Sequence, residues 1–313
     1  MSHSGRTPSS RRLRQAALFG AVTLLVLGGG FLHRLVAQAP MDEVKIKTQH
    51  VAGNIYMLEG RGGNIGVSAG EDGLLMVDDQ YAPLATKIRV ALEELKKGEL
   101  EFILNTHYHG DHVGSNAAFG PDAPIIAHDN VRARLVSGHQ PFGGTPKPLP
   151  REALPVITFD ESVTIHFNGE EIEVIHFPQG HTDGDSIIFF TGSNVVHMGD
   201  HMFVDSFPFV DLGAGGNVLG LTENVATVLE RIPADAGIIP GHGPLTDVDS
   251  LRRYHGMLKE TIEIVRQRKA EGQSLEEIQE AGLPSRWDSW GSGFIKTPDW
   301  LEFVHQSLEE RSS

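Results

Sequence analysis

Three histidines and an aspartate stand within six residues of one another, directly after an apolar run at 102–104. Neutral imidazoles and a carboxylate are ligands for zinc and related divalent ions. Alternate residues of an extended segment share a face, so the first two histidines project to one side, and the following glycine lets the last two groups turn toward a neighbouring point. A polar surface loop is the alternative, but four coordinating groups beside a buried strand favour metal. One metal cannot take all four comfortably, so the spacing predicts two metals held by His107, His109, Asp111 and His112.

Composition limits the remaining ligands and the partners. The 313 residues include 16 histidines and no cysteine, so every metal ligand must be nitrogen or oxygen. A formal net charge of −15 repels nucleic acid over most of the surface and argues against a nuclease or RNA-processing role. Hydrophobic residues at 40% and charged residues at 21% exclude a disordered or fibrous chain. We therefore expect a small-molecule substrate and no nucleic-acid partner.

The first 39 residues have the pattern of a targeting segment. Four arginines and no acidic residue precede an apolar run at 16–32, and Val-Ala-Gln-Ala follows at 36–39. A basic region, an apolar region and an Ala-x-Ala end are typical of a secretory signal, whereas a buried helix, the alternative, rarely follows such a leader. Pro40 is unfavourable just after a cut, so residues 1–39 are predicted as a signal peptide or an uncleaved membrane anchor. The expected location is periplasmic or secreted, with membrane contact only through this segment.

From Val44 onward, short β-rich runs with glycine punctuation alternate with amphipathic stretches. These runs predict strands at 54–58, 65–68, 74–77, 102–104, 163–167, 171–177, 186–190, 194–198 and 236–239. Helical periodicity predicts helices at 81–97, 128–136, 221–231 and 249–270. Interleaved strands and helices predict an α/β architecture in which helices cover the sheets. The glycines and prolines at 138–150 predict a surface loop.

The C-terminal region predicts a helical extension packed on the main domain. All three tryptophans lie at 284–304, and Trp300, Val304 and Leu308 have helical spacing. We favour a docked helix over a cofactor platform for this region. The expected organisation is a leader at 1–39, a main domain at 40–260 and the extension at 261–313.

The main domain resembles the metallo-β-lactamase superfamily, whose hallmark is His-x-His-x-Asp-His after a strand, as at 107–112. Three later segments match family motifs in order: Gly-His-Thr at 180–182, a strand ending in Gly-Asp at 199–200, and Pro-Gly-His-Gly at 240–243. The resemblance covers roughly residues 44–260, and its first motif is highly specific. It implies a four-layer αββα sandwich.

The resemblance also implies a complete ligand set for two zinc ions. The first zinc would be bound by His107, His109 and His181, the second by Asp111, His112 and His242, and Asp200 would bridge them. Redox diiron members place a glutamate where this chain has His109, a departure that favours zinc and hydrolysis over oxygen or nitric oxide reduction. A zinc pair supplies a bridging hydroxide at neutral pH, and Asp111 would orient it and accept its proton.

Two likenesses point toward the periplasmic zinc β-lactamases. The stretch at 181–187 is similar to their Gly-His-Thr-x-Asp-Asn segment, and the loop at 211–218 is similar to their substrate-facing loop. In that loop Asn217 is a catalytic candidate that would help to stabilise the oxyanion. Two departures count against them: Asp200 stands where these enzymes have a cysteine, and Phe203 where they have the lysine that grips the β-lactam carboxylate.

The implied function is an exported zinc-dependent hydrolase that cleaves a cyclic amide or ester, with a β-lactam among the candidates. The alternatives are a lactonase or thioester hydrolase of the same superfamily and, more remotely, a non-catalytic zinc-binding protein. The histidines outside the motifs are expected at the surface or in packing, except His201, a candidate for the rim of the pocket. The other six are His128, His139, His166, His176, His197 and His255.

Overall fold

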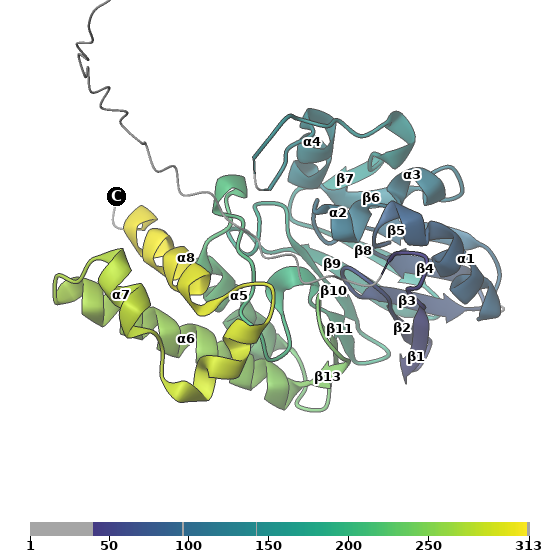
Figure 1. Ribbon diagram of the computed structural model, residues 1–313. Helices are drawn as coiled ribbons and strands as arrows, with labels where there is room; N and C mark the ends of the chain where they lie inside the picture. The colour runs from purple at the N-terminus through teal and green to yellow at the C-terminus, as the bar shows by residue number, and fades with distance from the viewer. Residues whose placement is uncertain (1–39, 96, 142, 312–313) are drawn as a thin grey trace, which may run out of the picture. The chain divides into compact units, whose positions relative to one another are not determined.

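The computed structural model describes residues 40–95, 97–141 and 143–311. They form two β-sheets packed face to face, with helices on both outer faces (Figure 1). This confirms the predicted αββα sandwich. The leader predicted at 1–39 lies outside the described residues. Within the described ranges, no helix combines the length and the apolar character needed to cross a membrane.

The first sheet has seven strands in sequence order, antiparallel from β1 to β4 and parallel from β4 to β7. Glycine-containing turns join the antiparallel strands, which is why the sequence pattern located most of them. Their bounds are β1 Lys47–Ala52, β2 Ile55–Glu59, β3 Ile65–Gly70, β4 Gly73–Val77, β5 Leu100–Leu104, β6 Ile125–His128 and β7 Ile157–Phe159. The sequence analysis missed β1, β6 and β7.

The second sheet has six strands in the order β13-β12-β11-β10-β9-β8. Only the β11–β12 pair is parallel, because α5 lies between those two strands in the chain. The bounds are β8 Ser162–Phe167, β9 Glu170–His176, β10 Ser186–Phe190, β11 Val195–His197, β12 Gly237–Ile239 and β13 Thr246–Asp247. The predicted strands in this half match β8 to β12 within one or two residues.

Alternation along the strands separates the layers of the core. In β4, Leu75 and Val77 join the apolar cluster between the two sheets, whereas Leu74 and Met76 pack with residues of α1 on the outer face. The second sheet is covered by α5 and α6, whose buried faces join its outer residues in one large cluster. Because side chains alternate with a period of two, a one-residue slip of β4 would exchange these two layers.

The helices follow the predicted positions with small differences at their ends. The predicted helix at 81–97 begins as a 3-10 turn, Ala82–Leu84, and continues as α1, and the loop predicted at 138–150 contains no helix or strand among its described residues. The helices are α1 Ala85–Glu94, α2 Gly110–Val113, α3 Asn116–Phe119, α4 Asp129–Ser137, α5 Val218–Arg231, α6 Val248–Ala270, α7 Leu275–Ala281 and α8 Thr297–Glu310.

The C-terminal helical region is present and α8 docks through Trp300, as its spacing predicted. The indole of Trp300 is buried, stacks on Phe207 and donates a 3.1 Å hydrogen bond to Oγ1 of Thr261. The boundary predicted between residues 260 and 261 falls inside the continuous helix α6, and residues on both sides of it belong to one compact unit. The extension therefore shares its core with the second sheet.

Candidate metal centre

All seven predicted ligands come together in two neighbouring groups. Within each group the potential donor atoms lie within 4.8 Å of one another. Each ligand follows the end of a strand, β5, β9, β11 or β12, so the fold gathers segments that are far apart in the sequence. The first group is His107, His109, His181 and Asp200, and the second is Asp111, His112 and His242.

The carboxylate of Asp200 lies between the two groups. Its Oδ2 is 3.4 Å from Nε2 of His181 and 3.8 Å from Nε2 of His107. Its Oδ1 is 3.1 Å from Nε2 of His112 and 3.3 Å from Nε2 of His242. One oxygen faces each group, which is the arrangement required of a ligand shared by two sites.

Two glycines let a neighbouring loop lie against the second group. Gly62 has φ of 101°, and a Cβ there would lie 2.7 Å from the carbonyl oxygen of Asp111. A Cβ on Gly63 would lie 2.0 Å from Cε1 of His112. Because a side chain at either position would collide with these groups, only glycine lets the loop approach them this closely.

Asp78 holds the ring of His112. Its Oδ2 is 2.7 Å from Nδ1 of His112, and it accepts hydrogen bonds from the backbone N–H and the hydroxyl of Thr106 at 2.8 and 2.7 Å. Nδ1 of His112 is thus engaged, and Nε2 is left to face Asp200. A carboxylate behind a ligating histidine fixes the ring orientation and makes the imidazole a stronger donor. The sequence analysis missed this residue, although Asp78 directly follows a predicted strand.

Asp211 has the same relation to His109. Its Oδ2 is 3.0 Å from Nε2 of His109 and accepts a hydrogen bond from the hydroxyl of Tyr108. Burial works to raise the pKa of Asp211, but these two hydrogen bonds lower it below its ordinary value, so the carboxylate is anionic. Similarity alone had placed Asp211 in a substrate-facing loop, whereas here it contacts a candidate ligand.

His181 is fixed by the backbone rather than by a carboxylate. Its Nδ1 lies 2.7 Å from the carbonyl oxygen of Phe209, and its Nε2 lies 2.8 Å from Nδ1 of His109. Nδ1 must therefore carry the proton, which leaves Nε2 as an acceptor pointing into the first group. The loop after β11 thus supplies the partners of both His181 and His109.

The electrostatics differ between the two groups. Burial lowers the pKa of His181 to about 4, and burial with a contribution from His112 lowers that of His107 well below its ordinary value. Burial also works to lower the pKa of His112 and His242, but Asp200 and Asp111 raise it in both. Neutral imidazoles are the form that ligates metal, and a site that favours positive charge on its histidines also favours a bound cation.

The donor set fits divalent metal. Nε2 of His107 and Oδ1 of Asp200 are buried, and neither has a hydrogen-bond partner within the described residues. Burying such atoms without partners costs about 1–3 kcal/mol each. Nitrogen and carboxylate donors aimed at shared points are the ligands of zinc and related ions. A metal ion would satisfy both buried atoms.

Asn217 lies at the start of α5, where its side chain caps the helix. Its Oδ1 accepts from the backbone N–H of Leu219 at 2.9 Å and of Gly220 at 3.4 Å. Its amide nitrogen reaches the carbonyl oxygen of Ser307 at 3.5 Å and a carboxylate oxygen of Glu310 at 3.3 Å. All of these partners belong to helices α5 and α8, and none to the ligand groups. The oxyanion role of Asn217 stays a prediction.

His201 is buried, not at a rim. Its Nε2 lies 3.1 Å from Nδ2 of Asn224, and burial together with His181 lowers its pKa to about 3. His128 and His176 stack on each other with ring centroids 3.7 Å apart. His128 and His176 thus pack against each other, whereas His166 is exposed on β8.

The comparison with protein families adds to this geometry. The family model of the metallo-beta-lactamase superfamily matches residues 50–254, which include all seven ligands. The chain belongs to the metallo-beta-lactamase superfamily. This confirms the resemblance drawn from the motifs. The chain therefore has the fold of a metallo-hydrolase superfamily and a His/Asp cluster that could bind metal.

Curated relatives are distant. The alpha subunit of 2,4-dinitroanisole O-demethylase from Nocardioides sp. (strain JS1661) is 24% identical over 163 residues, or 51% of this chain and 48% of that protein. The chain thus spans about half of that subunit. The probable metallo-hydrolase YqgX of Bacillus subtilis (strain 168) is 28% identical over 149 residues, or 47% of this chain and 70% of that protein.

Solved structures share the fold. A metallo-beta-lactamase from Pontibacter korlensis has a TM-score of 0.57 at 15% identity, over 69% of this chain and 99% of that one. The DIM-1 metallo-beta-lactamase has a TM-score of 0.58 at 18% identity, over 70% of this chain and 99% of that one. A double mutant of the sec-alkyl sulfatase PisA1 has a TM-score of 0.63 at 16% identity, over 84% of this chain and 50% of that one. At such low sequence identity, the structural similarity shows a shared fold but says nothing about the substrate.

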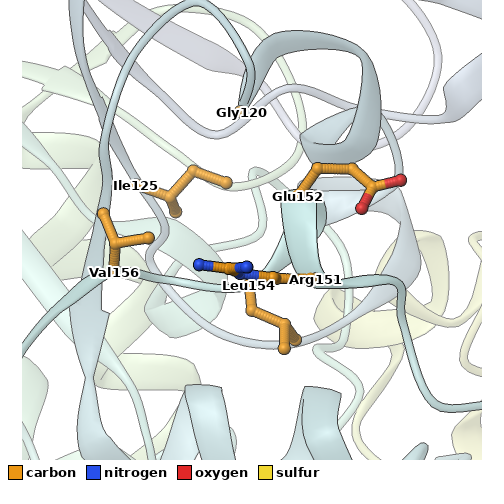
Figure 2. Close-up of a pocket in the computed structure, with 6 residues that line it drawn as sticks. All are labelled: Gly120, Ile125, Arg151, Glu152, Leu154 and Val156. Atoms are coloured by element: carbon orange, nitrogen blue, oxygen red, sulfur yellow. The ribbon is translucent and has the colours of Figure 1, made fainter.

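A separate pocket of about 220 Å³ lies at the ends of α3 and β6 (Figure 2). Figure 2 shows the side chain of Arg151 reaching toward Ile125 and Val156, whereas the carboxylate of Glu152 points away. None of its lining residues belongs to the ligand groups; they are Gly120, Ile125, Arg151, Glu152, Leu154 and Val156. Convergent polar groups mark a reactive site, and here they lie in the ligand groups rather than in this pocket.

Proposed function

We propose that this chain is a zinc-dependent hydrolase with two metal ions, acting on the carbonyl of a small cyclic amide or ester. The observation that carries the proposal is the position of Asp200, with one carboxylate oxygen facing each group of ligands. Each group combines nitrogen and oxygen donors, as zinc prefers, and the chain has no cysteine to offer. When bound, such a metal pair lowers the pKa of water to about 7 and polarises the carbonyl.

Asp111 is the residue proposed to move the proton. Its side chain keeps 22% of its surface exposed, and its Oδ2 lies 3.4 Å from Nε2 of His242 and 3.8 Å from Nε2 of His112. It is therefore both one of the candidate ligands and open to an arriving substrate. A carboxylate in that position can accept the proton of the attacking water and pass it to the leaving group.

The surroundings of His242 favour an ester, lactone or thioester over a β-lactam. Phe203 stands where the zinc β-lactamases that the chain resembles have a lysine, and its ring stacks on that of His242 at 4.7 Å. Losing a charge-assisted contact to the substrate carboxylate costs roughly 1.5–3 kcal/mol. A lactonase or thioester hydrolase thus fits better at this position, and a β-lactam remains the poorer substrate.

Export is proposed together with this activity. The basic, acid-free start of the chain and the apolar run at 16–32 support a signal peptide or an N-terminal anchor. The proposed location is the periplasm, the cell surface or the medium. N-terminal sequencing of the protein from a fractionated bacterial host tests it, since an intact Met1 in the soluble cytosolic fraction would contradict export.

The activity is tested by measuring kcat/KM of the purified, zinc-loaded protein for a lactone, a thioester, a penicillin and a carbapenem. Controls are EDTA-treated protein and Asp111→Asn. The proposal expects turnover of at least one ester-type substrate that both controls abolish. Zinc-loaded protein that is inert toward all four substrates would instead support a non-catalytic zinc-binding protein.

A further inference from the structure

Phenylalanine rings border the ligands on the side of the loop after β11. Phe203 is buried, with its ring 4.7 Å from that of His242 and 6.5 Å from that of His181. Phe209 is partly exposed, and its ring lies 5.7 Å from both His109 and His181. Both groups of ligands thus have an aromatic neighbour.

A third ring comes from the C-terminal helix. Phe303 on α8 is partly exposed and meets Phe209 edge to face at 5.7 Å. It lies outside residues 50–254, the part of the chain that matches the family model. The sequence that defines the superfamily therefore does not account for this ring. We call Phe203, Phe209 and Phe303 the phenylalanine border.

The border rests on a firmly packed support. Trp300, one turn before Phe303, is fully buried against Phe207. One turn after Phe303, the hydroxyl oxygen of Ser307 accepts a 3.0 Å hydrogen bond from the backbone N–H of Val218. Because α8 is fixed on both sides, Phe303 is held in place beside Phe209, and Figure 1 shows α8 running next to α5. Pre-positioned apolar side chains bind a ligand without first having to be ordered.

We propose that the phenylalanine border makes this site selective for neutral esters with an apolar acyl group, an alkyl chain or an aromatic ring. The proposal rests on the hydrolase proposed above and names its substrate class. Phenyl rings remove apolar surface from water but cannot pair with a charge, and burying an unpaired carboxylate against them is unfavourable. Each methylene buried there should raise kcat/KM about fourfold.

The test compares p-nitrophenyl acetate, butyrate and hemisuccinate with the full-length, zinc-loaded protein. Butyrate adds two methylenes to acetate, so we expect kcat/KM to rise about 15-fold, whereas the anionic hemisuccinate should fall below butyrate. Phe303→Ala should flatten the butyrate preference while bound zinc stays constant. Gln306→Ala is the matched control, since Gln306 is exposed on the same helix and its side chain donates a hydrogen bond to Glu302, one turn earlier.

Phe303→Leu keeps an apolar side chain in case the alanine variant folds poorly, and it should retain most of the preference. The outcomes separate the two proposals. Chelator-sensitive cleavage of acetate with equal rates for butyrate and hemisuccinate would overturn the border and leave the hydrolase standing. Zinc-loaded protein without chelator-sensitive cleavage of any of these esters or of the lactone, thioester and β-lactams would overturn the hydrolase itself. A butyrate preference that Phe303→Ala and Phe303→Leu both leave intact would overturn the role of α8.

Discussion

The two groups of candidate ligands differ in how far they open to solvent. In the first group, the side chains of His107 and His181 are 1% exposed and that of His109 is 7% exposed. In the second group, His112 is fully buried, but Asp111 is 22% and His242 28% exposed. In the proposed centre, the first group would hold an ion, and the second would hold an ion and also admit a substrate. Asp200 joins them.

Their supports differ in the same direction. In the first group Asp211 and the carbonyl oxygen of Phe209 fix two imidazoles from behind. In the second group Asp78 fixes only His112. We infer that the protein determines the geometry of the first site, whereas the geometry of the second would depend more on a bound ion and on the substrate. Single substitutions in each group and in its supports test this division.

Replacing the shared carboxylate should affect both groups at once. Removing one partner of a buried charged pair costs about 3–5 kcal/mol, so Asp200→Ala should weaken metal binding by about 10²–10⁴-fold. Zinc content after dialysis, measured by mass spectrometry, should drop in both sites. Asp205→Asn, an exposed aspartate paired with Arg253, should keep the full zinc content. Retention of two zinc ions by Asp200→Ala would show that Asp200 is not shared by the two groups.

A variant at Asp111 distinguishes zinc binding from catalysis. Asp111→Asn should lower kcat by roughly 10²–10⁴-fold, because general acid–base catalysis contributes that much. The zinc content should change little, since three other donors remain around the second site. They are the imidazoles of His112 and His242 and the carboxylate of Asp200. Steady-state kinetics and metal analysis on the same sample check this. A variant with full activity would show that the proton is carried by another group.

The two supporting carboxylates should act on different sites. Changing a group behind a ligating histidine typically lowers metal affinity about 10–100-fold. Asp211→Asn should therefore weaken the first site through His109, and Asp78→Asn the second through His112. Competition titration with a chelator that resolves the two binding steps measures this. If both variants weakened the same zinc-binding step, the two carboxylates would not support separate sites.

Asn217 gives the smallest effect expected here. As the N-cap of α5, its replacement by alanine should lower the free energy of unfolding by about 0.5–2 kcal/mol. Zinc content and kcat should stay close to those of the parent chain, because its hydrogen bonds run to α5 and α8. Urea denaturation and kinetics on the same preparation distinguish the roles. A kcat loss of orders of magnitude at unchanged stability would support the oxyanion role predicted from the sequence.

The sequence predicted the ligand groups well because their chemistry is local and unusual. His107, His109, Asp111 and His112 stand in one motif, and the other ligands lie in short segments with glycine on at least one side. Strands with alternating apolar residues and glycine turns, such as β3 and β4, were located for the same reason. Helix α8 was predicted from the spacing of its buried face.

Side-chain contacts between segments far apart in the chain could not be predicted from the sequence. Asp78 and Asp211 are ordinary aspartates until the fold brings them behind His112 and His109, at sequence separations of 34 and 102. Asn217 follows glycines in a loop, a pattern that fits a helix cap as well as a substrate contact. The strands β6 and β7 are short, and their apolar runs carry no period that separates strand from helix.

Asp200 is proposed to join two metal sites in one centre. Diffraction from crystals of the zinc-loaded protein, with anomalous data at the zinc edge, can locate the ions. We expect two peaks per chain, about 3.5–4 Å apart, one beside each carboxylate oxygen of Asp200. A single peak, or two peaks with Asp200 bound to neither ion, would contradict it.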